Sequence, residues 1–127
     1  MYANTGMRGA FPMGSVPTFS EQIATQVAAW PGVEVDRSEA GEIAFKVGPR
    51  ELGHLHGEHA AHFSFPPSVW RELREQDRIT PHPVFPGKAG PAARRIDDDD
   101  DVHDVVVLLR MNYERIVARH GIPASAA

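Results

Sequence analysis

The chain has 127 residues, of which 42% are hydrophobic and none is cysteine, so it has the size of one ordinary domain and forms neither disulfides nor thiolate metal sites. Its formal net charge of −4 disfavours nucleic-acid binding, because nucleic-acid-binding domains usually carry a basic face. The longest apolar runs, such as residues 105–109, are far shorter than the roughly 18–20 residues that cross a bilayer, and we expect a cytoplasmic protein without a membrane segment or signal peptide.

The first half of the chain predicts a helix followed by strands. Residues 1–17 show no hydrophobic period and predict a mobile leader. The spacing of Ile23, Val27 and Trp30 predicts a helix over residues 20–30, with Ser20 as its N-cap. Alternating apolar and polar residues then predict four short strands, over residues 33–36, 42–47, 51–56 and 61–65.

The second half predicts a helix, a long loop and one more strand. Residues 66–68 begin the helix, and Val69, Trp70 and Leu73 form its apolar face. Residues 81–91 contain four of the eleven prolines and predict a loop longer than the usual 2–6 residues. Long ordered loops often carry function. A short last strand is expected over residues 92–96.

Five aspartates at residues 97–101 precede a predicted amphipathic helix of about 18 residues, which Gly121 ends. Their position favours a capping role, because carboxylates accept hydrogen bonds from the free N–H groups and face the positive end of the helix dipole. A divalent-cation loop is the alternative, but the glycine turn and distal glutamate of an EF-hand are missing.

The order of these elements predicts the fold class. Consecutive strands are joined by short turns, so we expect an α+β fold with a small, mostly antiparallel sheet of 4–6 strands and helices packed on one face. We expect one domain over residues 18–121, preceded by the leader at 1–17 and followed by a tail at 122–127.

A histidine-rich hairpin is the most informative stretch. Four of the seven histidines lie within nine residues, at His54, His56, His59 and His62. His54 and His56 share one face of their strand, because side chains alternate along a strand. His62 joins them if the turn around Gly57 holds an odd number of residues, and it faces the other way if the number is even. The sequence leaves this parity open.

These histidines support two hypotheses. The leading one is a non-catalytic module that binds a small molecule or a protein, because no complete catalytic constellation is present. It uses His54, His56 and His62, with His82 from the long loop and Arg94 as further ligand-binding candidates, and we expect no cofactor. The alternative is a metal-dependent hydrolase or oxygenase, in which converging imidazoles of His54, His56 and His62 hold Zn²⁺ or another divalent metal.

A third hypothesis is nucleic-acid binding through the cations Lys88, Arg94 and Arg95. The acidic balance of charge disfavours it.

Several strings of residues resemble the small bacterial and fungal luciferase-domain proteins. They are Trp30-Pro31-Gly32-Val33-Glu34, Phe45-Lys46-Val47-Gly48, Pro81-His82-Pro83 and, most specific, Glu51-Leu52-Gly53-His54-Leu55-His56. The resemblance places His54, His56, His62 and His82 at the family's histidine positions and implies no agreed substrate or cofactor. A more distant likeness to the MmcQ/YjbR group implies a compact α+β domain of the CyaY-like kind.

Overall fold

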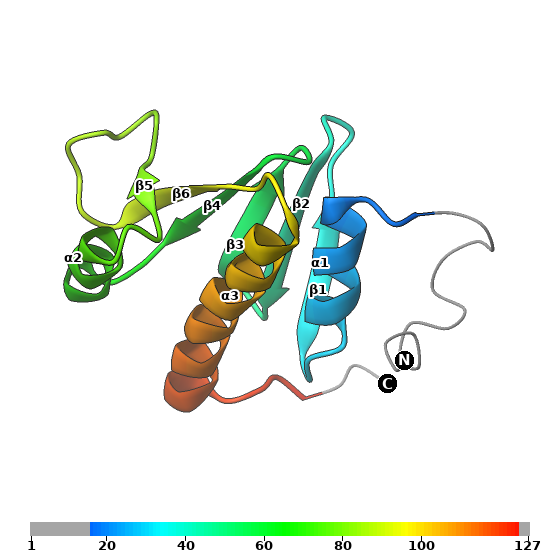
Figure 1. Ribbon diagram of the computed structural model, residues 1–127. Helices are drawn as coiled ribbons and strands as arrows, with labels where there is room; N and C mark the ends of the chain where they lie inside the picture. Colours follow the sequence, from blue (N-terminus) through cyan, green and yellow to red (C-terminus); the bar gives the residue numbers. More distant parts are fainter. Residues whose placement is uncertain (1–15, 125–127) are drawn as a thin grey trace.

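The computed structural model describes residues 16–124 (Figure 1). The expected mobile leader therefore lies outside the described residues except for Val16 and Pro17, as do the last three residues of the expected tail. In chain order the elements are α1 (Phe19–Ala28), β1 (Val33–Arg37), β2 (Glu42–Val47), β3 (Arg50–His56), β4 (Ala60–Ser64), α2 (Pro67–Glu75), β5 (Thr80–Pro81), β6 (Pro91–Arg95) and α3 (Asp99–His120).

All six strands form one open antiparallel sheet in the order β1-β2-β3-β4-β6-β5. The helices lie on one side of it, where α1 packs beside α3; α1 covers β1 and β2, and α3 covers β2 and β3 (Figure 1). The α+β class, the antiparallel sheet and the placement of the helices are confirmed. No helix within residues 16–124 combines the length and apolar character needed to span a bilayer.

The hydrophobic core lies between the helices and the sheet. Ile43, Phe45 and Val47 of β2 are buried, whereas the residues between them are partly exposed, as the period of two requires. Val105 and Leu109 of α3 cover this surface from the helix side at helical spacing, and both are at most 1% exposed. The alternation predicted for this strand therefore determines which face of the sheet packs against the helices and which face they leave open.

A β-bulge interrupts β3 within residues 51–56, the string that carries the most specific part of the family resemblance. Glu51 and Gly53 pair with consecutive residues of β2, which leaves Leu52 as the extra residue. Leu52 and Leu55 are both buried, although an odd separation would place them on opposite faces of a regular strand. The bulge therefore returns Leu52 to the core and leaves Glu51 on the same face as the histidines that follow it.

Gly53, next to the bulge, occupies a position where no side chain fits. A Cβ atom at Gly53 would lie 2.8 Å from Leu109 Cδ2 of α3 and 2.9 Å from the backbone oxygen of His62. Packing at this density leaves no room for an extra carbon. The glycine thus lets α3 and β4 approach β3 closely.

The N-cap of α1 is Thr18, and the prediction of Ser20 is wrong. Thr18 Oγ1 accepts from the Glu21 N–H at 3.2 Å, and Glu21 Oε1 accepts from the Thr18 N–H at 2.8 Å, which completes a capping box. Ser20 is buried instead and donates its N–H and hydroxyl to the carboxylate of Glu58. Glu58, in the β3–β4 turn, thereby joins the histidine hairpin to α1.

The start of α3 and the presence of β5 also differ from the expected elements. Asp98 is the N-cap of α3, accepting from the Asp101 N–H at 2.9 Å, so the capping role of the aspartates is confirmed. The helix nevertheless starts inside the acidic run and spans 22 residues. Strand β5 was not predicted, because two residues are too few to show an alternation.

Candidate functional site

The β3–β4 turn settles the parity that the sequence left open. Three residues, 57–59, separate the two strands, and His54 pairs directly with His62. Directly paired residues share a face, so His54, His56 and His62 all lie on the side of the sheet opposite the helices.

His82 joins these histidines from the loop after β5. The centroid of the His62 ring lies 5.1 Å from that of His54, 5.3 Å from that of His56 and 4.5 Å from that of His82. We call these four residues the histidine cluster, with His62 at its centre. His59 lies elsewhere, since its Nδ1 is 2.9 Å from the Ile96 carbonyl oxygen.

Two hydrogen bonds, one near each end, fix the loop that carries His82. The Trp70 indole N–H of α2 donates to the Pro91 carbonyl oxygen at 2.9 Å. His82 Nδ1 accepts from the Val84 N–H at 3.1 Å. This bond requires an unprotonated Nδ1, so the neutral ring carries its proton on Nε2 and presents an N–H donor there.

Carboxylates orient two other imidazoles. His54 Nδ1 lies 2.9 Å from Glu51 Oε2, and His56 Nδ1 lies 2.9 Å from Glu42 Oε2. An ionised carboxylate only accepts hydrogen bonds, so both Nδ1 atoms carry the proton and donate. Neither ring's Nε2 has a hydrogen-bond partner within residues 16–124, which leaves it available to a ligand.

Burial and neighbouring charges shift the pKa values of two cluster histidines in opposite directions. Burial, with the nearby imidazoles of His82, His54 and His56, lowers the pKa of His62 to about 4. The hydrogen bond to Glu51 raises the pKa of His54 despite its burial, and the same bond lowers the pKa of Glu51. His62 is therefore uncharged at neutral pH beside a histidine that protonates more readily.

The cluster lines an open pocket of about 230 Å³, which we call the histidine pocket. His54, His62 and His82 of the cluster line this mainly apolar pocket, together with Glu51, Gly53, Phe63, Ser64, Phe85 and Pro91. Phe85 is 50% exposed, and its ring centroid lies 5.5 Å from that of His82. The volume lies below the roughly 300–1,000 Å³ of drug-sized sites, so the pocket suits a small ligand.

The arrangement of the rings does not form a metal centre. No group of three or more His, Cys, Asp or Glu side chains in the described part of the chain could hold a metal ion. His56 and His62 are stacked at an interplanar angle of 22°, and His54 meets His62 edge to face. Stacked rings present their faces to each other, whereas a metal needs ring nitrogens directed at one point.

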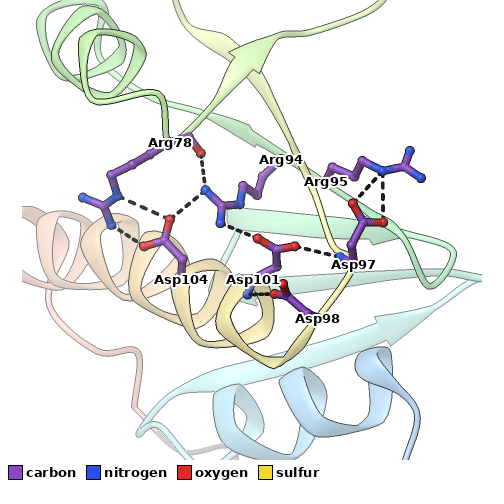
Figure 2. A network of polar contacts seen from close by, with 7 residues as sticks. All are labelled: Arg78, Arg94, Arg95, Asp97, Asp98, Asp101 and Asp104. Atoms are coloured by element: carbon purple, nitrogen blue, oxygen red, sulfur yellow. Dashed lines mark hydrogen bonds and ion pairs between the residues drawn. The ribbon is translucent and has the colours of Figure 1, made fainter.

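The structure brings Arg94 to two aspartates of α3 (Figure 2) and not to the histidine cluster. Its neighbour Ala93 pairs with His62 on the uncovered face, so Arg94 points to the helix side. There its guanidinium pairs with Asp101 at 2.7 Å and with Asp104 at 3.0 Å. Arg94 is thus committed to joining β6 to the first turns of α3.

Arg95 and Lys88, the other two cations of the nucleic-acid hypothesis, have different surroundings from each other. Arg95 pairs with Asp97 at 2.8 Å, as Figure 2 shows. Lys88 is exposed on the long loop, with its Nζ 6.0 Å from the centroid of the Phe85 ring. Two of the three charges are therefore compensated by aspartates.

Sequence reasoning missed three residues of this site, namely Glu42, Glu51 and Phe85. Glu51 stands in the same string as His54, but only the bulge brings it to the same face. Glu42 reaches His56 through direct pairing of β2 with β3, which a single sequence does not specify. An exposed phenylalanine in the long loop was the available signal for Phe85.

Fold and site together define a small α+β domain with one helix-covered sheet face and one open face that bears a histidine pocket. The Luciferase domain family matches residues 49–112, or 64 of the 127 residues, and the chain belongs to this family. The match runs from the start of β3 into α3 and includes the whole histidine cluster. No curated protein and no solved structure matches the chain, and no comparison shows the likeness to the MmcQ/YjbR group.

Proposed function

We propose that this domain is a non-catalytic binding module whose histidine pocket holds a small planar ligand. The observation that carries the proposal is the gathering of three imidazoles, those of His54, His62 and His82, with Phe85 around one pocket, on the face of the sheet that the helices leave open. Planar side chains give a ligand large contact areas at a low cost in conformational entropy.

The hydrogen-bonding groups narrow the chemistry of the ligand. The His82 ring offers an Nε2–H donor, and the Nε2 of His54 is an acceptor while that ring is neutral and a donor once it is protonated. The uncharged His62 between them favours an apolar ring over a charged group. An aromatic or heteroaromatic molecule with a donor and an acceptor on its edge fits these features.

The absence of a nucleophile–base pair supports a binding role. Ser64 provides the only hydroxyl side chain among the residues that line the pocket. Within residues 16–124 no hydrogen bond joins its hydroxyl to a histidine. Covalent catalysis by serine relies on activation of the hydroxyl by such a base.

Binding is tested by titrating isotope-labelled protein with small aromatic probes, namely indole, benzamide and 2-aminopyridine, while backbone amide NMR shifts are recorded. We expect saturable shifts at β3, β4 and the loop of Phe85, and their loss in a His82→Ala variant. His103→Ala is the matched control, because His103 is exposed on α3. Folded protein that shows no saturable shift with any probe, or equal binding by His82→Ala and wild type, contradicts the proposal.

A divalent-metal site at His54, His56 and His62, and with it a metal-dependent enzyme, is the second candidate. It is favoured by the contact of these rings and by the uncharged state of His62, since a metal ligand must be deprotonated. The rings would have to turn from their stacked arrangement. Stoichiometric metal in tag-free protein, and a Zn²⁺-dependent rise in Tm that His62→Ala abolishes, support it. Metal below about a tenth of a site with no rise in Tm rejects it.

A further inference from the structure

A second pocket lies where the C-terminal end of α3 meets the start of β3. It is open, has a volume of about 490 Å³, and is lined mainly by charged side chains. We call it the basic pocket, because four of its seven lining residues are basic: Arg50, Arg115, Arg119 and His120. Such a concentration contrasts with the formal net charge of −4 of the whole chain.

Within residues 16–124 the three arginines of this pocket, like Arg37, Arg71 and Arg74, have no carboxylate partner, whereas four other arginines do. Arg78, Arg94, Arg95 and Arg110 each form an ion pair with an aspartate or glutamate. No such pair involves a basic-pocket arginine within residues 16–124; Arg115 donates instead to the neutral amide oxygen of Asn112 at 2.5 Å. The pocket therefore concentrates positive charge that the described part of the chain does not neutralise.

The one acid in the pocket is already engaged. Glu51 accepts a hydrogen bond from His54, which lowers the pKa of the glutamate, and it does not pair with Arg50. The pKa of His120 is lowered by desolvation and by the positive charges of Arg50 and Arg119. Two guanidinium groups from separate elements thus act on one point at the end of α3.

Stabilisation of the helix explains only part of this cluster. Cations in the last turn of a helix interact favourably with its dipole, and Arg119 and His120 occupy that turn. Arg50 belongs to β3, and Arg115 lies more than one turn before the end of α3. Their convergence with Arg119 on one pocket needs a different reason.

We infer that the basic pocket is a binding site for an oxyanion of the phosphate class. Guanidinium groups bind phosphate through paired, charge-assisted hydrogen bonds, and three arginines on one pocket match the several oxygens of such an anion. The volume falls within the range of small-molecule sites. Inorganic phosphate and the phosphate group of a small phosphomonoester share this chemistry.

The basic pocket adjoins the histidine pocket, since Glu51 and Ser64 line both. Anion binding at the arginines nevertheless requires no ligand among the imidazoles. The His82→Ala variant should therefore keep full affinity for phosphate, so failure of the histidine pocket and failure of the basic pocket are distinguishable.

The experiment titrates inorganic phosphate and phenyl phosphate separately into the full chain at constant ionic strength, with amide and His120 ring shifts recorded by NMR. We expect saturable shifts at the basic pocket, and at least tenfold weaker binding in the double variant Arg50→Gln/Arg119→Gln. Both side chains are exposed, so this variant should stay folded, with at most a small fall in Tm from the loss of Arg119 at the end of α3. Arg37→Gln/Arg71→Gln is the control, because it removes the same charge at exposed positions of β1 and α2.

Each outcome is decisive. Tighter binding of phenyl phosphate than of inorganic phosphate indicates that the anion is part of a larger ligand, and equal or weaker binding indicates that the pocket recognises the phosphate group alone. Shifts that do not saturate, or equal weakening in the basic-pocket variant and the Arg37→Gln/Arg71→Gln control, show a general charge effect and overturn the inference. A basic-pocket variant that unfolds is replaced by Arg119→Gln alone, compared with Arg37→Gln alone under the same criterion.

Discussion

His54 and His62 pair directly across the β3–β4 ladder, with ring centroids 5.1 Å apart and ring planes at 86°. Only His54 has a carboxylate partner, the Glu51 side chain. The pKa of His54 is consequently raised, whereas burial lowers the pKa of its neighbour His62 to about 4. Adjacent imidazoles therefore titrate on opposite sides of the ordinary histidine value.

This separation predicts the pH dependence of stability. Between pH 6.5 and about 4 the unfolded chain protonates His62 and the folded chain does not, so the free energy of unfolding falls as the pH falls through this range. The raised pKa of His54 acts oppositely: its contribution is fully present below pH 6.5 and is lost as the pH rises through the folded value.

Urea unfolding at pH 7.5 and pH 5 tests the effect of the lowered His62 pKa on stability. We expect a His62→Gln variant to lose less stability than wild type between these pH values, because it removes the group that only the unfolded state protonates. His103→Gln should behave as wild type. An NMR titration in which His62 protonates near pH 6.5 would contradict the assignment.

Replacement of Gly53 by alanine should destabilise the fold. The added Cβ would lie 2.8 Å from Leu109 Cδ2 and 2.9 Å from the His62 backbone oxygen, and the backbone atom has little freedom to move. Overpacking of this kind costs about 1–3 kcal/mol in the free energy of unfolding. Chemical denaturation measures it, and Gly87→Ala, where the added carbon meets nothing within 4 Å, is the control. Equal stability of the two variants would show that β3 adjusts freely at the bulge.

The ion pairs of Arg94 should stabilise the junction of β6 and α3 more than a surface pair does. Asp104 binds both Arg94 and Arg78, and the three side chains are only 18–29% exposed. Exposed pairs contribute about 0–1 kcal/mol and breaking a buried pair costs about 3–5 kcal/mol, so we expect Arg94→Gln to cost about 2 kcal/mol.

A double-mutant cycle of Arg94→Gln with Asp104→Asn measures the coupling directly. Lys46→Gln, which breaks the exposed pair with Asp36, serves as the comparison. A cost for Arg94→Gln no greater than that for Lys46→Gln would place this network among ordinary surface contacts.

Glu58 should stabilise the fold by joining the hairpin turn to α1. Its carboxylate accepts from both the N–H and the hydroxyl of Ser20. Hydrogen bonds to a charged group typically contribute about 1.5–3 kcal/mol, so Glu58→Ala should lower the unfolding free energy by about 2 kcal/mol. Glu39→Ala, at an exposed position, should change it little. In a Ser20→Ala background the effect of Glu58→Ala should shrink, and full additivity of the two would contradict the contact.

The sequence alone predicted the features that depend on neighbours within a few residues. Alternation along residues 42–47 correctly predicted a strand, whose apolar residues Ile43, Phe45 and Val47 are buried, because the side-chain period of a strand is two. The aspartates before α3 were correctly interpreted as capping groups, since a carboxylate reaches the N–H three residues ahead. Element type and fold class followed from such local rules.

Tertiary structure decided how those elements meet. The bulge at Leu52 and the three-residue turn set which face carries His54 and His62. Contacts between segments far apart in the sequence bring His82 to these histidines and Arg94 to Asp104. Each contact depends on the packing of α3 against the sheet and on pairing between distant strands. One sequence specifies which residues are able to pair, but the balance of packing over the whole core selects the register, and with it the site.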